Sequence, residues 1–289
     1  MQPAIVAMVL AAAVAHAVWN IASKYKQGDT LLFVWAYTCV SVLWCVPVGA
    51  IVMAKEPLAL DWHFAVGAAV SAALHVAYSM ALQAGYDRAE LGVVYPIARG
   101  TAPMLTMVCA VLLLGERLDT VAVLGALLIV AGILVVTGNP FGRGNHRPLQ
   151  GTLWGTATGA TIASYTLWDS YSVTSWHLPP AGYYAGTLLL QLMILTPAAL
   201  RRRHRMSAAL RTDALPIVMV AVFSPLAYML VPTAMQGAPV ALVAPLRESS
   251  IVVGALLGYW LFRENHLARR VAGAVVVLAG IAAISSCRS

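Results

Sequence analysis

The chain has 289 residues, of which 61% are hydrophobic and only 10% are charged, and its mean hydropathy is +0.80. Soluble domains carry about 25% charged residues, so this composition excludes an ordinary water-soluble globular protein. The formal net charge of +7 does not indicate a nucleic-acid partner, because the positive side chains cluster in short loops between apolar runs, as membrane orientation requires. We therefore expect the lipid bilayer, and no nucleic acid, to surround most of the chain.

Apolar runs of about 20 residues, the length of a membrane-crossing helix, follow one another from end to end. Because lipid offers no partner for unpaired backbone groups, the predicted fold class is an all-α integral membrane protein. Ten transmembrane helices are predicted, at about residues 3–23, 31–53, 64–85, 91–114, 120–138, 151–171, 181–200, 214–234, 239–262 and 268–286. The connections between them are short, so no extramembrane domain is expected.

The first predicted helix carries a polar and aromatic face formed by His16, Trp19 and Asn20, which are spaced at three and four residues. Rings that desolvate a ligand and amides that orient it suit a cavity wall. The alternative is an aromatic belt at the membrane interface, because Lys24 ends this helix soon after Trp19. No Lys or Arg precedes the run, so we expect a retained helix and not a cleaved signal peptide.

Further candidates follow on the third, fourth and eighth predicted helices. His75 and Tyr78 are three residues apart on the third helix, so they share a face. Tyr95 on the fourth helix and Tyr228 on the eighth add hydrogen-bonding groups near the expected cavity. Taken singly, each is more often a packing residue than a ligand contact.

Ionisable side chains inside a membrane helix cost about 2.5–3.5 kcal/mol on insertion scales, so they usually face a cavity or a partner. Four such residues lie away from the predicted helix ends: Arg99, Asp169, Arg247 and Glu248. Arg99 follows Pro96 by three positions. Arg247 follows Pro245 by two, so both arginines are expected at similar depth, where proline frees backbone groups to line a cavity.

The two arginines together predict a site for carboxylate or phosphoryl oxygens. The alternative is structural: either arginine could pair with Glu248 or Asp169 and hold the helices in place as a buried ion pair. Adjacent helical residues point about 100° apart, so Glu248 need not satisfy Arg247.

An internal repeat is the most specific organisational signal. On the sixth predicted helix, Tyr165, Trp168 and Asp169 repeat the polar and aromatic face of the first helix. The pair Trp168-Asp169 stands 149 residues after Trp19-Asn20. Five further residues recur at a displacement of 148, as Glu116, Gly125, Ala131, Gly132 and Ile133 and then as Glu264, Gly273, Ala279, Gly280 and Ile281.

Five helices per half are an odd number, so the second half enters the membrane from the opposite face and the repeat is inverted. The predicted organisation is a first repeat at residues 1–138, a connecting loop at 139–150 and a second repeat at 151–289. Substrate is expected near the membrane midplane, between the halves.

The repeated glycines lie seven residues apart on one face, as Gly125 and Gly132 on the fifth helix and as Gly273 and Gly280 on the tenth. Small residues so placed permit close helix packing, either within one chain or between two, so monomer and homodimer both stay open. The two repeated glutamates are interpreted as helix-end contacts.

The positive charge is distributed unevenly between the two membrane sides. The loops after the odd-numbered predicted helices carry 13 Lys and Arg residues, and the other side carries three. The arginine-rich side is therefore predicted to be cytoplasmic, with both termini outside. The expected location is the cell membrane, with many passes, and the short loops suit a bacterial inner membrane.

Two stretches, from Ala102 to Val136 and from Ile251 to Ile284, resemble the end of an EamA domain. This places the chain beside the drug/metabolite transporter superfamily, whose ten-helix members it resembles in length and in its tandem halves. The resemblance implies secondary transport. It does not fix the substrate, because similar members are linked to amino acids, drugs, nucleotide sugars and sugar phosphates.

We therefore expect a secondary transporter of a small anionic or zwitterionic metabolite, such as an amino acid, an organophosphonate or a phosphorylated compound, that works by alternating access through a central cavity. The candidate substrate-binding residues are His16, Trp19, Asn20, His75, Tyr78, Tyr95, Arg99, Tyr165, Trp168, Asp169, Tyr228, Arg247 and Glu248. Coupling to protons could involve a histidine, which titrates near neutrality, or a buried carboxyl group.

Two other functions remain open. An exporter of cationic drugs or amines would use Asp169 and Glu248 as binding anions. An intramembrane enzyme acting on a lipid would use the same acids together with His75. The chain carries no common enzyme motif and its four cysteines form no CxxC pair, so we expect no enzyme activity, no metal and no cofactor.

Overall fold

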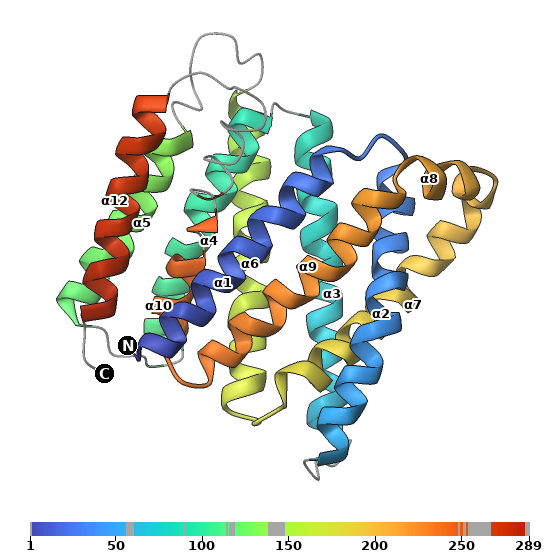
Figure 1. Ribbon diagram of the computed structural model, residues 1–289, viewed down its shortest axis with the longest axis horizontal. Helices are drawn as coiled ribbons and strands as arrows, with labels where there is room; N and C mark the ends of the chain where they lie inside the picture. Colours follow the sequence, from blue (N-terminus) through green and yellow to red (C-terminus); the bar gives the residue numbers. More distant parts are fainter. Residues whose placement is uncertain are drawn as a thin grey trace.

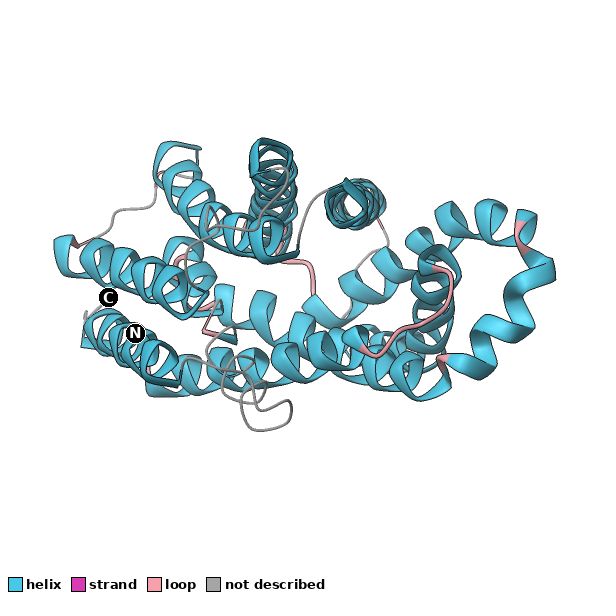
Figure 2. Ribbon diagram, turned by 90° about the horizontal axis from the view of Figure 1, so that it is seen from above, coloured by secondary structure: helices cyan, strands magenta, loops and turns pink. Residues whose placement is uncertain are grey.

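A computed structural model describes residues 2–55, 61–88, 91–113, 115, 119–137, 148–247, 249–250, 253 and 267–286. Every regular element in these ranges is helical (Figure 1 and Figure 2). The helices are α1 (Pro3–Lys24), α2 (Thr30–Lys55), α3 (Trp62–Arg88), α4 (Leu91–Leu113), α5 (Thr120–Thr137), α6 (Pro148–Thr174), α7 (Pro180–Arg201), α8 (Met206–Thr212), α9 (Ala214–Met235), α10 (Val240–Arg247) and α12 (Leu267–Ser286). The predicted all-α fold class is confirmed.

The described helices follow the predicted membrane spans closely. Nine of the ten predicted spans coincide with a described helix, and α10 covers the first part of the remaining one, 239–262. One connection differs from the prediction: residues 201–213 contain a short 3-10 turn, Arg203–Arg205, and then α8. This segment becomes helical because Ala209 packs against Leu32 of α2 and Ala199 of α7, which gives it a buried face.

Five helices, α1, α2, α3, α7 and α9, are long and apolar enough to cross a membrane. Helices α4, α5 and α12 contain shorter apolar stretches. Large apolar side chains such as Leu43, Leu112 and Leu278 point outward, as they do when lipid is the solvent. The start of α1 and the end of α12 lie on the same side of the molecule, called here the side of the termini, and α8 lies on the opposite side (Figure 1).

Helix packing repeats between the two halves, which are α1 to α5 and α6 to α12. In the repeat, α1, α2 and α3 correspond to α6, α7 and α9. The contact between α1 and α9 is repeated by the contact between α6 and α3, and the contact between α3 and α7 is repeated by the contact between α9 and α2. Equivalent helices also meet in pairs: α2 with α7, α4 with α10, and α5 with α12. The halves therefore interlock about a pseudo-twofold axis, as expected for an inverted repeat.

Helices α5 and α12 meet through their glycines at one end of the molecule (Figure 1). A Cβ atom built on Gly132 would lie 2.8 Å from the Gly273 carbonyl oxygen. A Cβ atom built on Gly280 would lie 2.5 Å from the Gly125 carbonyl oxygen. The repeated glycines thus bring two helices of one chain into backbone contact. Of the two possibilities left open by the sequence, packing within one chain is the one observed for these glycines.

A second pair of glycines joins the halves nearer the centre. On α6, Gly155 faces the Val94 carbonyl oxygen of α4, and Gly159 faces the Ala98 carbonyl oxygen one turn further along. Added Cβ atoms at these glycines would lie 2.9 and 3.0 Å from those oxygens. This spacing of four residues lets α4 and α6 pack closely, beside the helix stretches that form the central cavity.

The α1–α2 loop is fastened to the start of α9 by Asp213, which is fully buried. The Gln27 and Gly28 N–H groups donate to the two Asp213 carboxylate oxygens, at 2.8 and 2.9 Å. A Cβ atom at Gly28 would lie 2.7 Å from one of these oxygens, so only glycine allows this approach. Asp29 adds an ion pair with Arg202 at 2.8 Å.

Asp29 lies outside the membrane-spanning segments and also caps α2. Partial burial raises the pKa of its carboxyl group, but the Leu32 N–H and the Arg202 guanidinium outweigh this effect and hold the pKa below its usual value. Two carboxylates thus hold the loop, and Asp29 stays a charged partner of Arg202 at neutral pH.

Asp213→Asn should lower the melting temperature in detergent by several degrees. The amide keeps one acceptor oxygen and points an NH₂ group at the second backbone N–H, and a buried donor without a partner costs about 1–3 kcal/mol. The matched control is Asp119→Asn, because Asp119 is exposed and caps α5 in a role that asparagine fills equally well. Equal melting temperatures for the two variants would contradict this account of the loop.

Candidate functional site

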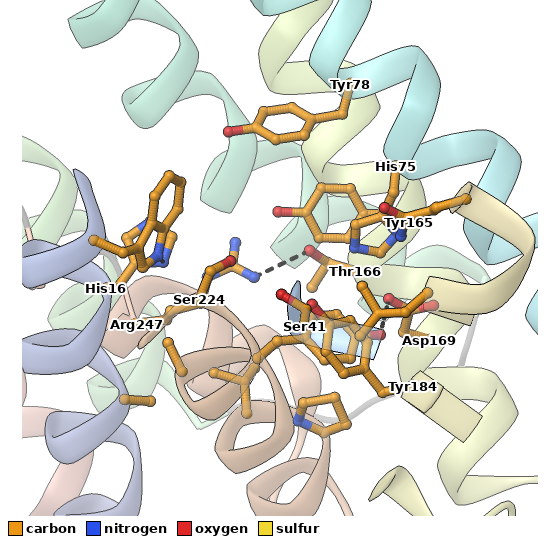
Figure 3. A pocket seen from close by; sticks show the side chains of 18 of the residues that line it. His16, Ser41, His75, Tyr78, Tyr165, Thr166, Asp169, Tyr184, Ser224 and Arg247 are labelled. Carbon is orange, nitrogen blue, oxygen red and sulfur yellow. Dashed lines mark hydrogen bonds between the residues drawn. The ribbon is translucent and has the colours of Figure 1, made fainter. Parts of the chain in front are cut away.

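A cavity of about 110 Å³ lies at the centre of the helices, between the two halves (Figure 3). Its walls come from α1, α2, α3, α6, α7, α9 and α10. The polar and aromatic side chains that line it are His16, Trp19, Tyr37, Ser41, His75, Tyr78, Ser79, Tyr165, Thr166, Asp169, Tyr184, Gln191, Ser224, Tyr228 and Arg247. The volume suits a small solute and is too little for a large drug.

Arg247 supplies positive charge to this cavity. It ends α10, all eight residues of which are buried, and its own side chain is only 8% exposed. The Nη1 group donates to the Thr166 hydroxyl of α6 at 3.4 Å. In Figure 3 the guanidinium points from α10 toward Thr166, with His16 on one side and Asp169 on the other. A fork of N–H groups there matches a carboxylate or phosphonate group.

His16 stands between two donors. The Trp19 indole N–H points at Nδ1 at 3.2 Å, and the Arg99 guanidinium points at Nε2 at 2.8 Å. Neither partner can accept a hydrogen bond, so the neutral ring accepts from one of them and its own N–H faces the other; a second proton would place both ring N–H groups against donors. The surroundings of His16 therefore disfavour a second proton on the ring.

Arg99 has a different position from Arg247, although the sequence repeat relates the two. It is buried on α4 and reaches the cavity through its contact with His16, whereas Arg247 lines the cavity itself. At the His16 end of the cavity, Arg247 therefore forms part of the wall, and Arg99 lies behind His16. Only Arg247 is in position to touch a solute directly.

Asp169 supplies the negative charge and is only 2% exposed. The Tyr183 hydroxyl donates to its Oδ1 at 2.7 Å, and the Tyr228 hydroxyl donates to its Oδ2. Among the described residues, no lysine or arginine forms an ion pair with this carboxylate. The charge is therefore stabilised by two hydroxyl groups and not by a neighbouring cation.

Aromatic rings surround Asp169 on the cavity side. Tyr228 stacks on Tyr184, with ring centroids 4.0 Å apart and planes at 20°. His75 stacks on Tyr165 at 4.2 Å and meets the edge of Tyr228 at 5.4 Å. Faces of this kind attract an ammonium group, so the Asp169 end is built for a cation or a hydrogen-bond donor.

The tautomer of His75 follows from its contacts. Its Nδ1 lies 2.9 Å from the Ser71 carbonyl oxygen, which can only accept, so Nδ1 carries the hydrogen. Its Nε2 is then an acceptor on a ring that lines the cavity. Tyr78 completes this wall by meeting the edge of Tyr165 at 5.7 Å.

Not every predicted candidate lies in this cavity. The Trp168 indole N–H donates to the Gly67 carbonyl oxygen at 3.0 Å, and the ring packs against Trp176 at 5.5 Å, away from the lining residues. The side chains of Asn20 and Tyr95, and all of Glu248, lie outside the described residues, as do Glu116 and Glu264. Eight of the predicted residues line the cavity: His16, Trp19, His75, Tyr78, Tyr165, Asp169, Tyr228 and Arg247.

Several lining residues were missed because they are ordinary polar residues in apolar helices. Tyr37 and Ser41 of α2 are four residues apart, as are Ser224 and Tyr228 of α9. Residues at this spacing share a helix face, and this spacing could have identified them as residues of the cavity wall. Ser41 has a second role. Its hydroxyl lies 3.1 Å from the Ala221 carbonyl oxygen, which loses its helical donor at Pro225.

Comparison with known proteins supplies the remaining observations. The model of the EamA-like transporter family matches residues 3–138 and again residues 149–286. Twenty-nine chains of solved structures match the fold. One, a crystal structure, superposes with a TM-score of 0.76 at 16% sequence identity and covers 98% of this chain and 96% of that one. No protein with curated annotation matches the chain.

Proposed function

Because the chain belongs to the EamA-like transporter family, whose members move small molecules across membranes, we propose that it carries a small zwitterionic or anionic metabolite. The proposal covers secondary transport by alternating access, with the two interlocked halves rocking about the central cavity. The chain is a multi-pass membrane transporter with a small-molecule substrate and a lipid environment.

One observation carries the choice of substrate. Arg247 and Asp169 line the same small cavity and lie toward opposite sides of it (Figure 3). An acidic group at Arg247 and an ammonium group at the Asp169 end would each meet an opposite charge. A substrate with both groups satisfies both ends at once, and a plain anion satisfies the first.

The alternatives receive less support. An exporter of cationic drugs would have to bring its substrate close to Arg247, at a cost in like-charge repulsion. A lipid-modifying enzyme would need His75 and Asp169 to act together, yet among the described contacts no hydrogen bond joins them and Tyr228 stands between. Neither alternative uses the arginine end of the cavity.

Of the two cavity histidines, His75 suits proton coupling better than His16. Its ring lines the cavity, and the groups around it are hydroxyl-bearing rings from α6 and α9, Tyr165 and Tyr228, with Asp169 beyond. His16 instead faces two donors, one of them a guanidinium. Proton coupling through His75 is part of the proposal.

We also place the protein in a bacterial inner membrane with α8 on the cytoplasmic side. The exposed arginines at the end of α7, in the 3-10 turn and on α8 support this orientation under the positive-inside rule. A single chain supplies both halves of the cavity wall, so we take one chain as the transporting unit.

The test is a thermal-shift screen of the purified protein followed by uptake into proteoliposomes. Zwitterions such as L-alanine and aminoethylphosphonate should raise the melting temperature most, methylphosphonate less, and tetramethylammonium least. A compound that stabilises the protein should then cross the membrane unchanged. Stabilisation by tetramethylammonium alone would replace this proposal with the cation exporter.

Asp169→Asn should weaken binding of zwitterions more than binding of anions. Removing a buried charge that pairs with a ligand costs about 2–5 kcal/mol, so the affinity for aminoethylphosphonate should fall by roughly 30-fold or more. Methylphosphonate lacks the ammonium group and should bind nearly as before. Tyr183→Phe is the matched control, since it removes one hydrogen bond to Asp169 but keeps the charge. Equal losses for the two ligands would argue against an ammonium site at Asp169.

A further inference from the structure

A second cavity, of about 480 Å³, lies next to the central one. Its walls come from the last turns of α6, the turn between α9 and α10, and the end of α4, and its lining residues are Leu113, Ser170, Tyr171, Thr174, Ser175, Met235, Gln236, Gly237, Ala238 and Pro239. A Cβ atom on Gly237 would lie 2.8 Å from Ile5 near the N-terminus, so this cavity is on the side of the termini, opposite α8.

The two cavities share one residue. Met235 lines both, and its side chain is only 4% exposed. The two cavities also meet different faces of α6, since Asp169 lines the central cavity and the next residue, Ser170, lines the outer one. Along α9 the central lining ends at Met235 and the outer lining begins there. Among the described residues, the flexible apolar side chain of Met235 is therefore the one common to the walls of both spaces.

The helix that carries Met235 is weakened just before it. Pro232 lies inside α9, lines the central cavity and cannot donate to the Tyr228 carbonyl oxygen. Tyr228 is also the residue whose hydroxyl binds Asp169. A change at the cavity wall can thus bend α9 at Pro232 and move Met235, since prolines are where helices kink.

The outer cavity has neutral polar walls. Ser170, Thr174 and Ser175 supply hydroxyl groups, although the Thr174 hydroxyl already donates to the Ser170 carbonyl oxygen at 2.7 Å, and Gln236 supplies an amide. Among the described residues that line it, none is charged. Such walls bind a small polar solute weakly, as a station on a transport path must, because tight binding would prevent release.

We propose that this outer cavity is a second, low-affinity station for the same small polar substrate, and that Met235 is the gate between it and the central site. The proposal rests on the proposed function, because it places the station on the route of the transported solute. In this proposal, the path from the central cavity through the outer cavity opens on the side of the termini.

Variants of Met235 test the gate. Met235→Trp should slow transport of aminoethylphosphonate into proteoliposomes by about tenfold or more, because gating steps often limit turnover. Gln236 lines only the outer cavity, so Gln236→Ala should raise KM several-fold while the thermal shift caused by the ligand stays that of the unaltered protein. Met193→Ala is the matched control, since Met193 is 70% exposed on α7 and touches neither cavity. Wild-type transport by Met235→Trp would overturn the proposal.

A second measurement needs no substrate. A cysteine placed by Ser41→Cys reports access to the central cavity, and a membrane-impermeant thiol reagent should reach it from the side of the termini about tenfold faster when Met235→Ala removes the gate. Unchanged labelling would also overturn the proposal. If the labelling of Ser41→Cys responds to Met235→Ala as expected but no compound binds, the proposed substrate class fails and the gate stands.

Discussion

Arg247→Ala is expected to abolish binding of carboxylate and phosphonate compounds. Arg247 is the arginine that lines the central cavity, and a buried charge that loses its charged partner costs about 2–5 kcal/mol, or roughly 30-fold to several thousand-fold in affinity. Arg247→Lys should fall between, because it keeps the charge and loses the forked geometry. Titration of aminoethylphosphonate by thermal shift, together with uptake into proteoliposomes, measures both effects.

Two controls make this result specific. Arg211→Ala removes an exposed arginine next to α9 and should leave binding unchanged. Arg99→Ala should weaken binding less than Arg247→Ala, because Arg99 acts through His16 and does not line the cavity. Binding that survives Arg247→Ala undiminished would remove the main support for an acidic substrate group.

Gly280→Ala should be the most damaging single-methyl change for stability. Its Cβ atom would lie 2.5 Å from the Gly125 carbonyl oxygen and 2.7 Å from Ile129, so α5 and α12 must move apart. Overpacking of this kind costs typically about 1–3 kcal/mol and occasionally more. Gly132→Ala should behave similarly, because its Cβ atom would meet the Gly273 carbonyl oxygen at 2.8 Å. Melting temperatures in detergent provide the measurement.

Gly100→Ala is the matched control for this prediction. Gly100 lies inside α4, and the nearest atom to an added Cβ is Leu134 Cδ2 at 3.6 Å, an ordinary contact. Alanine is favoured over glycine within a helix by about 1 kcal/mol, so this variant should be neutral or more stable. The sign of the effect thus differs between the two glycines. A Gly280→Ala protein as stable as Gly100→Ala would mean that α5 and α12 do not pack as described.

The helices were predictable because the bilayer sets a length and a composition for each one. Nothing about their neighbours is needed to see that residues 3–23 or 214–234 cross a membrane. The repeated glycines were predictable as close packing sites for a similar reason, since small residues at fixed spacing allow helices to approach whatever the partner is. The family was recognisable from the same repeat.

The candidate site was only partly predictable. Trp19 and Trp168 occupy equivalent places in the two halves, yet Trp19 lines the cavity beside His16 while Trp168 binds the Gly67 carbonyl oxygen behind it. Arg99 and Arg247 differ in the same way. Helical spacing shows which residues share a face, but it does not show how that face is rotated toward the other helices.

The sequence by itself therefore determined the membrane class, the positions of the described spans, the inverted repeat and part of the cavity lining, because lipid and helical periodicity act locally along the chain. Only the tertiary structure decided which arginine lines the cavity, that two tyrosines hold Asp169, and that Met235 stands between two cavities. Those features depend on the rotation and crossing of helices distant in sequence, which packing between the halves sets.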